Sequence, residues 1–220
     1  MKLEMKEKTH MRNVACMLLM IALPTLAAAQ DQPKAEFPPG FIVRTDNPGE
    51  PATDVAFVTM SPGWHLTTGP AAILYNPSNG ASGEYRVETE TFLFDPGSRN
   101  EAYGIFFGGK ELTGAAQSYS YFMIRRSGEF LLKRRSGDEF SVVTDWTAHP
   151  AIITWDGKGE AGTAKNIMAV EVGAERVRFF VNGQEVGSVA RSAVDADGVV
   201  GLRVNHSLNL HVTRLDVLPR

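Results

Sequence analysis

Two glutamates, Glu88 and Glu90, form the only acidic pair in the sequence whose spacing and context could support hydrolysis. They lie within residues 84–94, where side chains alternate in character as on a β-strand. Residues two apart on a strand share a face, with Cα atoms about 6.5 to 7 Å apart, so one carboxyl group could act as acid and the other as nucleophile on a glycosidic bond. The favoured alternative is a solvated strand face beside Arg86, because alternating charge is common on antiparallel strands.

A second group of side chains could bind a ligand by stacking or by charge. The aromatic members could stack on a flat apolar ligand, although each is otherwise expected in the core. The basic members belong to a cluster in residues 125–135 that could contact an anionic glycan or surface, and the favoured alternative is a set of solvated strand ends. The candidates for ligand binding are Trp64, Tyr121, Arg125, Arg134 and Trp146, with Tyr103 and Tyr119 as further aromatic candidates.

Metal and cofactor patterns are incomplete in this sequence. Asp195-Ala-Asp197-Gly198 resembles part of a calcium loop, but the first and last ligand positions would hold Ala193 and Val204. His206 and His211 are five residues apart and would lie on opposite sides of a regular strand, so we do not expect joint zinc binding. The sequence also has no nucleophile elbow, phosphate loop or dinucleotide fingerprint. We therefore expect no metal site and no cofactor.

The N-terminal residues predict an exported protein. Residues 11–30 have a basic start, an apolar run that is short for a bilayer, and a small-residue end at Ala27-Ala28-Ala29. This pattern is typical of a secretory signal peptide, so we expect residues 1–29 to be removed and the mature chain to be periplasmic or extracellular without a membrane span. The alternative is an N-terminal anchor, which Pro24 and the small-residue end disfavour.

Composition favours one domain and argues against nucleic acid as a partner. Removal of the leader would leave about 190 residues, enough for a core that buries roughly 70% of the unfolded surface. The leader carries a net charge of +2, so the formal charge of −3 becomes −5 in the mature chain. Cys16 is the only cysteine and lies in the leader, so the mature chain would contain no thiol. The sequence does not indicate an oligomeric state.

The mature chain shows the pattern of an all-β protein. Residues 30–40 are polar and contain prolines, so we expect a flexible lead-in before a single domain at residues 41–220. About twelve short apolar or alternating runs are separated by turn residues, and none shows sustained helical periodicity. The prediction is an antiparallel β-sandwich of the jelly-roll type.

Two hairpins are distinct enough to predict a register. Ser127-Gly128 as a two-residue turn would pair Arg126 with Glu129. Both faces of that hairpin would be apolar, so a loop, the N-terminal segment or a ligand must cover the second face. Near the C-terminus, a connection at residues 173–176 would pair Val172 with Val177, and Asn182-Gly183 would form a tight turn with positive φ. The faces predicted for the first hairpin hold Phe130, Met123 and Leu132 on one side and Phe122, Ile124 and Leu131 on the other.

Several segments together resemble the concanavalin A-like lectin/glucanase superfamily over roughly residues 53–218. The nearest branch is similar to secreted bacterial domains grouped with 3-keto-disaccharide hydrolases and laminin G-like modules, and it implies a sandwich that handles carbohydrate. A related glucanase family carries Glu-x-Asp-x-x-Glu on one strand, but here Glu88-Thr-Glu90 is followed by Leu93 at the third acidic position. The resemblance rests on residues 103–108, 121–124, 128–134, 146, 151–152, 166–170 and 180–183.

Three functions follow from these observations. We expect a secreted carbohydrate-binding, lectin-like module. The first alternative is a glycoside-processing hydrolase of the 3-keto-disaccharide hydrolase type that uses Glu88 and Glu90. The second alternative is an extracytoplasmic scaffold or interaction domain without a small ligand, whose own loops cover the second apolar face.

Overall fold

The structure is a computed structural model that describes residues 37–47, 49–159 and 161–220. The expected signal peptide at residues 1–29, and most of the lead-in, lie outside the described residues. No helix in the described part of the chain has the length and apolar character needed to cross a membrane. The described residues belong to one compact unit.

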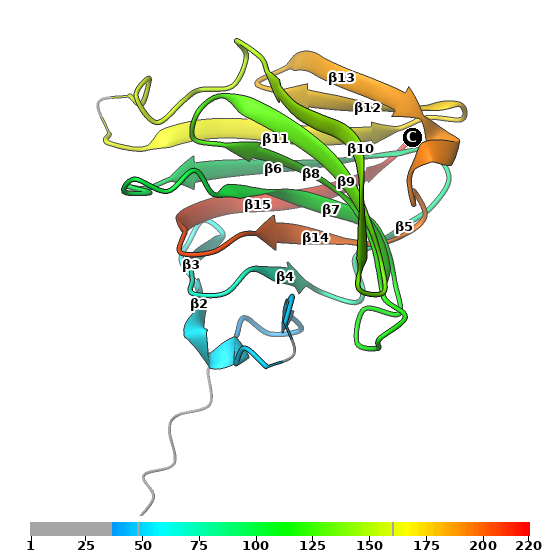
Figure 1. Ribbon diagram of the computed structural model, residues 1–220, viewed down its shortest axis with the longest axis horizontal. Helices are drawn as coiled ribbons and strands as arrows, with labels where there is room; N and C mark the ends of the chain where they lie inside the picture. The colour runs from blue at the N-terminus through cyan, green and yellow to red at the C-terminus, as the bar shows by residue number, and fades with distance from the viewer. Residues whose placement is uncertain (1–36, 48, 160) are drawn as a thin grey trace, which may run out of the picture. The chain divides into compact units, whose positions relative to one another are not determined.

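The described residues form two antiparallel sheets in two layers (Figure 1). In the eight-stranded sheet the order is β1 (Ile42–Thr45), β4 (Ala72–Tyr75), β14 (Gly198–Val204), β7 (Ala102–Lys110), β8 (Ser118–Arg125), β9 (Glu129–Ser136) and β10 (Glu139–Ala148), and β5 (Gly80–Ala81) also pairs with β14. In the seven-stranded sheet the order is β13 (Gln184–Ala190), β12 (Arg176–Val181), β11 (Ala164–Val172), β6 (Tyr85–Leu93), β15 (Asn209–Pro219), β3 (Trp64–Thr68) and β2 (Val55–Thr59).

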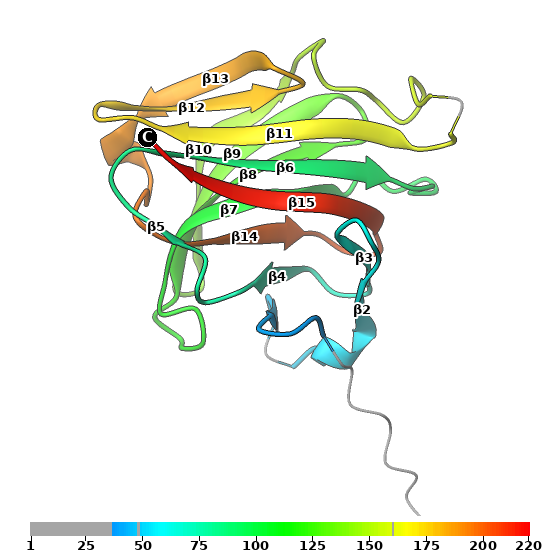
Figure 2. The ribbon, with the colours of Figure 1, turned by 180° about the vertical axis from the view of Figure 1, so that it is seen from behind.

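Strands far apart in the sequence lie side by side in both sheets. The C-terminal strand β15 lies between β6 and β3, and β14 lies between β4 and β7 (Figure 2). The only helices described are two short 3-10 turns, η1 (Ala52–Asp54) and η2 (Arg191–Ala193). The all-β, antiparallel jelly-roll sandwich predicted from the sequence is confirmed.

The core lies between the two sheets and follows the alternation of the sequence. In β6 the side chains from Tyr85 to Leu93 alternate strictly between buried and half-buried. The buried set faces the inner side chains of β7 and β8, among them Ile105 and Phe122. Each large apolar side chain buried in this way contributes about 1.5–3 kcal/mol.

The predicted register of the β8–β9 hairpin is wrong by one residue. Arg125, not Arg126, pairs with Glu129, because the turn has three residues and ends at Gly128, which has a φ of +89°. The ion pair follows the same register, with Arg125 Nε 2.7 Å from Glu129 Oε2. The predicted faces are corrected accordingly: Phe122, Ile124, Phe130 and Leu132 face the core, and Tyr121, Met123 and Leu131 lie on the other face.

The predicted register of the C-terminal hairpins is confirmed. Val172 pairs with Val177, and Glu171 and Arg178 lie opposite each other on the solvent side. Asn182 and Gly183 both have positive φ, at 50° and 80°, as a tight turn of this type requires. The local signal suffices here because both turn positions demand residues that tolerate positive φ.

Candidate functional site

The outer face of the eight-stranded sheet, the face turned away from the seven-stranded sheet, carries a second set of buried apolar side chains. This face is the second apolar face anticipated from the sequence. Protein covers part of it, because Phe106 and Tyr119 are fully buried. The set consists of Ile73, Tyr75, Ala102, Phe106, Leu112, Tyr119, Tyr121, Met123 and Leu131.

A pocket of about 270 Å³ remains over this face. Its floor is made by Tyr121, Met123 and Leu131, which are neighbours on β8 and β9. Its other lining residues are Asp46, Ala71, Lys133, Phe140, Trp146, Arg203, Asn205 and His206. The site therefore combines an apolar floor with polar groups at its margin, as small-ligand sites generally do.

Two aromatic side chains of the edge strand β10, Trp146 and Phe140, form one side of the pocket. Phe140 is 45% exposed and Trp146 is half-buried. The pairing of β10 with β9 is irregular between Thr144 and Thr147, and such a bulge redirects the side chains within it. The Arg125 guanidinium lies 4.1 Å from the centre of the Trp146 ring. This cation–π contact and the Arg125–Glu129 ion pair hold the indole in position.

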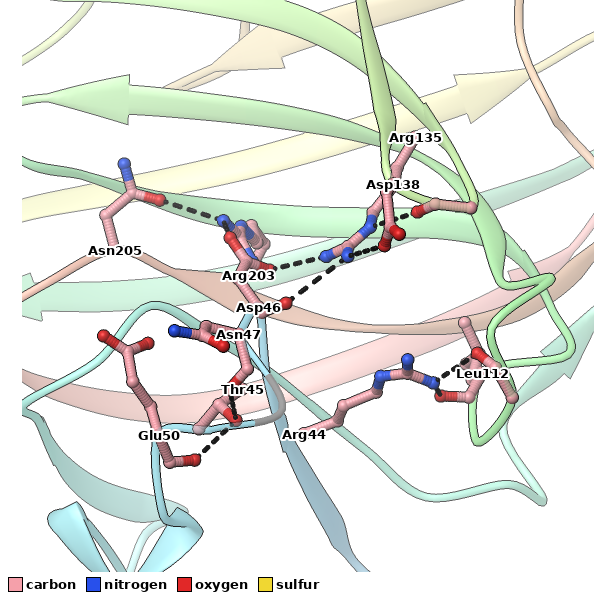
Figure 3. A network of polar contacts seen from close by, with 12 residues as sticks. Arg44, Thr45, Asp46, Asn47, Glu50, Leu112, Arg135, Asp138, Arg203 and Asn205 are labelled. Carbon is pink, nitrogen blue, oxygen red and sulfur yellow. Dashed lines mark hydrogen bonds and ion pairs between the residues drawn. The ribbon is translucent and has the colours of Figure 1, made fainter.

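Asp46 forms the opposite side of the pocket and binds two buried arginines (Figure 3). Arg203 Nη1 and Nη2 each donate to the Asp46 carboxylate at 2.5 Å, which is the bidentate geometry that a guanidinium favours. Arg135 Nη1 donates to the same carboxylate at 2.9 Å. Arg203 and Arg135 come from β14 and β9, so Asp46 joins two distant strands across the sheet face.

The turn after β1 presents Asp46 to the two arginines. The Thr45 hydroxyl donates to the carbonyl oxygens of Asn47 and Glu50 at 3.0 and 2.9 Å, which closes this turn. The backbone N–H of Asp46 donates to the Ala71 carbonyl oxygen at 2.9 Å. The N-terminal segment, one of the three covers anticipated for the second apolar face, therefore supplies part of the cover.

Burial and ion pairing shift the pKa values of two groups in the pocket. Burial alone would lower the pKa of Arg203, but the hydrogen bonds to Asp46 together with the charges of nearby acidic groups outweigh burial and raise this pKa above its usual value. Burial raises the pKa of Tyr121, so its hydroxyl stays protonated at neutral pH. The Arg203 guanidinium lies 5.5 Å from the centre of the Tyr121 ring. The floor of the pocket is therefore neutral, and the Asp46 side carries charge.

Lys133, Asn205 and His206 supply the remaining polar groups of the pocket. Lys133 is half-buried and makes no ion pair with any residue that the structure describes. His206 Nδ1 is 4.0 Å from Glu101 Oε2. Asp46 is the only carboxylate among the described residues that line the pocket, and two guanidinium groups already hold it. The arrangement can stack on a flat ligand and donate hydrogen bonds to it, but it offers no pair of acids for hydrolysis.

The structure brings only some of the predicted ligand-binding residues together. Tyr121 and Trp146 line the pocket, and Arg125 lies against Trp146. Arg134 is elsewhere, because its Nε pairs with Asp195 Oδ2 at 2.6 Å. Trp64 packs edge-on against Phe41, with ring centres 5.1 Å apart. Both residues therefore stabilise other parts of the sandwich.

Two further aromatic candidates, Tyr103 and Tyr119, are not exposed as a stacking role requires. Tyr103 is 2% exposed in the core between the sheets, where burial raises its pKa to about 12. Tyr119 is fully buried on the outer face of the eight-stranded sheet. For these two residues the buried position that the sequence analysis favoured is confirmed, and the alternative stacking role is not supported.

Sequence reasoning missed Asp46 and Arg203, the two residues that define one side of the pocket. Arg203 had a usable signal, because it is the one charged residue in the otherwise apolar strand Gly198–Val204. A buried charge in such a strand requires a partner of opposite sign. Asp46 had no comparable signal, because it lies in a polar turn 157 residues away from Arg203.

Glu88 and Glu90 lie on the outer face of the other, seven-stranded sheet. Glu88 pairs with Arg86 at 2.8 Å and with Arg214 at 2.6 Å. Glu90 pairs with Lys165 at 2.9 Å. Partial burial would raise the pKa of each carboxyl group, but the hydrogen bonds and the attraction of the neighbouring cations together outweigh burial and lower both pKa values. A general acid needs the opposite shift.

The remaining acidic and histidine residues do not converge. Among the described residues, no group of three or more His, Cys, Asp or Glu side chains is placed to hold a metal ion. In the segment that resembled a calcium loop, Asp195 pairs with Arg134, and Asp197 pairs with Arg191 at 2.8 Å. His211 lies opposite His65 on the neighbouring strand β3.

The fold is shared with solved structures of low sequence identity. The chain is similar to the carbohydrate-binding module CBM66 from Bacillus subtilis, with a TM-score of 0.60 and 13% identity over 81% of this chain and 95% of that one. It is also similar to a Bacillus licheniformis β-glucanase, with a TM-score of 0.55 and 10% identity over 84% and 95%. No family model and no curated protein sequence matches the chain.

The chain has the antiparallel jelly-roll fold of these structures. The fold that the sequence resemblance implied is therefore confirmed. Identities near 10% show a common fold and leave function to be argued from the site.

Proposed function

We propose that this protein binds carbohydrate through the pocket on the outer face of the eight-stranded sheet. The observation that carries the proposal is the pair of accessible aromatic rings, Trp146 and Phe140, beside a rigid polar wall formed by Asp46 and Arg203. A sugar ring has apolar C–H faces and a rim of hydroxyl groups. Aromatic rings suit the faces, and fixed charged and amide groups suit the hydroxyls.

The comparison structures support this proposal by analogy. Two proteins of the same fold are, by name, a carbohydrate-binding module and a β-glucanase. Export across the cytoplasmic membrane is part of the proposal, supported by the leader at residues 1–29.

The hydrolase alternative lacks a supporting arrangement in the structure. The described residues that line the pocket contain one carboxylate, and two arginines bind it. Glu88 and Glu90 lie on the other sheet with lowered pKa values. We therefore propose a binding module and do not assign the 3-keto-disaccharide hydrolase activity that the sequence resemblance suggested.

Glycan-array screening of residues 30–220, followed by calorimetric titration of the best ligand, tests the proposal. We expect Trp146→Ala to weaken binding about tenfold, because aromatic contacts are worth about 0.5–1.5 kcal/mol beyond the area they bury. Phe180→Ala is the matched control, because Phe180 also lies under guanidinium groups, those of Arg86 and Arg178, but on the other sheet.

Two outcomes would contradict the proposal. If no glycan binds, the scaffold alternative gains support. If Phe180→Ala weakens binding as much as Trp146→Ala while both variants remain folded, the binding face has been assigned to the wrong sheet.

A further inference from the structure

We propose that the bound glycan carries a negative charge, as a carboxylate or sulfate group, and that Lys133 recognises it. This inference rests on the proposed function and names the ligand class of the same pocket. Its basis is an imbalance of charge among the groups that line the pocket or pair with its lining residues.

Basic groups exceed acidic groups at this pocket. Arg203 and Lys133 line it, and Arg135 shares the carboxylate of Asp46 with Arg203. The second carboxylate near Arg135 is that of Asp138, at 3.7 Å, and its side chain is 99% exposed, so solvent weakens this contact. Among the described residues, the firmly held Asp46 carboxylate therefore faces three cations, and the Glu101 carboxylate is farther away, 4.0 Å from the lining residue His206.

Of these cations, Lys133 is the one available to a ligand. Arg203 and Arg135 are 4% and 3% exposed and are committed to Asp46, so a ligand would have to displace that carboxylate to reach them. Lys133 lies opposite Tyr121 on β8 and opposite Val142 on β10, between the pocket floor and the edge strand. It is half-buried, and no described carboxylate pairs with it.

Lys165, on the outer face of the seven-stranded sheet, differs from Lys133 because it has a carboxylate partner. Lys165 of β11 also lies beside an aromatic ring, 5.4 Å from the centre of Phe92, but its ammonium group is 2.9 Å from Glu90 Oε2. That lysine has an internal counter-ion. The anion that would neutralise Lys133 is not part of the described protein.

A charged ligand group would gain more from Lys133 than a hydroxyl group would. Hydrogen bonds between two ionised groups are roughly twice as strong as those between neutral groups. The buried arginines add favourable long-range attraction, because salt screens partly buried charges less than exposed ones. The surplus is local, since the whole chain has a net charge of −3.

The test compares charged and neutral forms of one ligand. The probes are a galacturonic acid trisaccharide and its methyl ester, which separate a carboxylate from its neutral form, and sulfated and unsulfated dextran oligosaccharides, which do the same for sulfate. Each is titrated by calorimetry into the wild-type mature protein, Lys133→Gln and Lys165→Gln, with thermal melts to confirm folding.

We expect one of the two charged probes to bind at least tenfold more tightly than its neutral form. Lys133→Gln should remove that preference, and Lys165→Gln should retain it. Equal affinity for charged and neutral forms would overturn this inference and leave carbohydrate binding intact. Equal losses in both lysine variants would indicate non-specific attraction and would also overturn it. Failure of every array glycan, by contrast, would overturn the proposed function itself.

Discussion

The outer faces of the two sheets differ in how their charges are balanced. On the seven-stranded sheet, five acidic and five basic side chains pair with one another: Glu88, Glu90, Glu171, Glu185 and Asp216 with Arg86, Lys165, Arg178, Arg214 and Arg220. On the eight-stranded sheet, Arg44 and Lys133 have no carboxylate partner in the described part of the chain. Arg44 instead donates to backbone carbonyl oxygens, at 2.9 Å to that of Gly114.

This difference supports the face proposed for the ligand. On the seven-stranded face each charge pair in solvent contributes about 0–1 kcal/mol, and the exposed Arg176 donates to the Ser188 hydroxyl at 2.6 Å. The eight-stranded face has an apolar floor, accessible aromatic rings and a cation without a counter-ion.

The largest expected effect is a difference in stability between a variant that loses a carboxylate paired with buried arginines and one that loses an exposed carboxylate. Asp46→Ala should lower the free energy of unfolding by about 3 kcal/mol, because it leaves two buried guanidinium groups without their counter-ion. Asp216→Ala is the matched control on the other face, where the carboxylate is 48% exposed and pairs with Arg214. We expect that variant to lose less than about 1 kcal/mol. Urea denaturation measures both, and similar losses would remove the contrast between the faces.

An intermediate effect concerns the response to acid. The folded-state pKa values of Glu88 and Glu90 lie below the ordinary value of 4.5, so their stabilising contribution is present above pH 4.5 and is lost as pH falls through the lowered values. The double variant Glu88→Gln/Glu90→Gln should therefore be about 1 kcal/mol less stable than the wild type at pH 7, and this difference should shrink as the pH falls below 4.5. Thermal melts across this pH range measure the difference. A stability difference between wild type and variant that grows as the pH falls would contradict the assigned pKa directions.

The smallest expected effect is on the unpaired lysine. Lys133→Gln should change stability by no more than about 0.5 kcal/mol in either direction, because the side chain has no ion pair to lose. Thermal melts at low and high salt measure the change. A loss above 1 kcal/mol would show that Lys133 has a structural partner and that the charge surplus of this face is smaller than inferred.

Part of this architecture could be derived from the sequence alone. Alternation in residues 84–94 predicted β6, because strand faces repeat every two residues. Asn182-Gly183 predicted the turn between β12 and β13, because positive φ restricts the residue type at both positions. The β8–β9 register was missed because Ser127-Gly128 fits a two-residue turn as well as a three-residue turn that ends in glycine. One residue of error reversed the faces of β9.

The pocket itself was decided by tertiary structure. Trp146 and Tyr121 were among the aromatic candidates, but the sequence could not separate these two pocket-lining residues from Tyr103, which lies between the sheets, because the surroundings of each ring depend on what packs against it. The Asp46–Arg203 pair joins residues 157 apart, and no local pattern encodes such a distance. Residue types and alternation thus determined the sandwich, whereas the crossing of distant strands decided which charges found partners among the described residues and which did not.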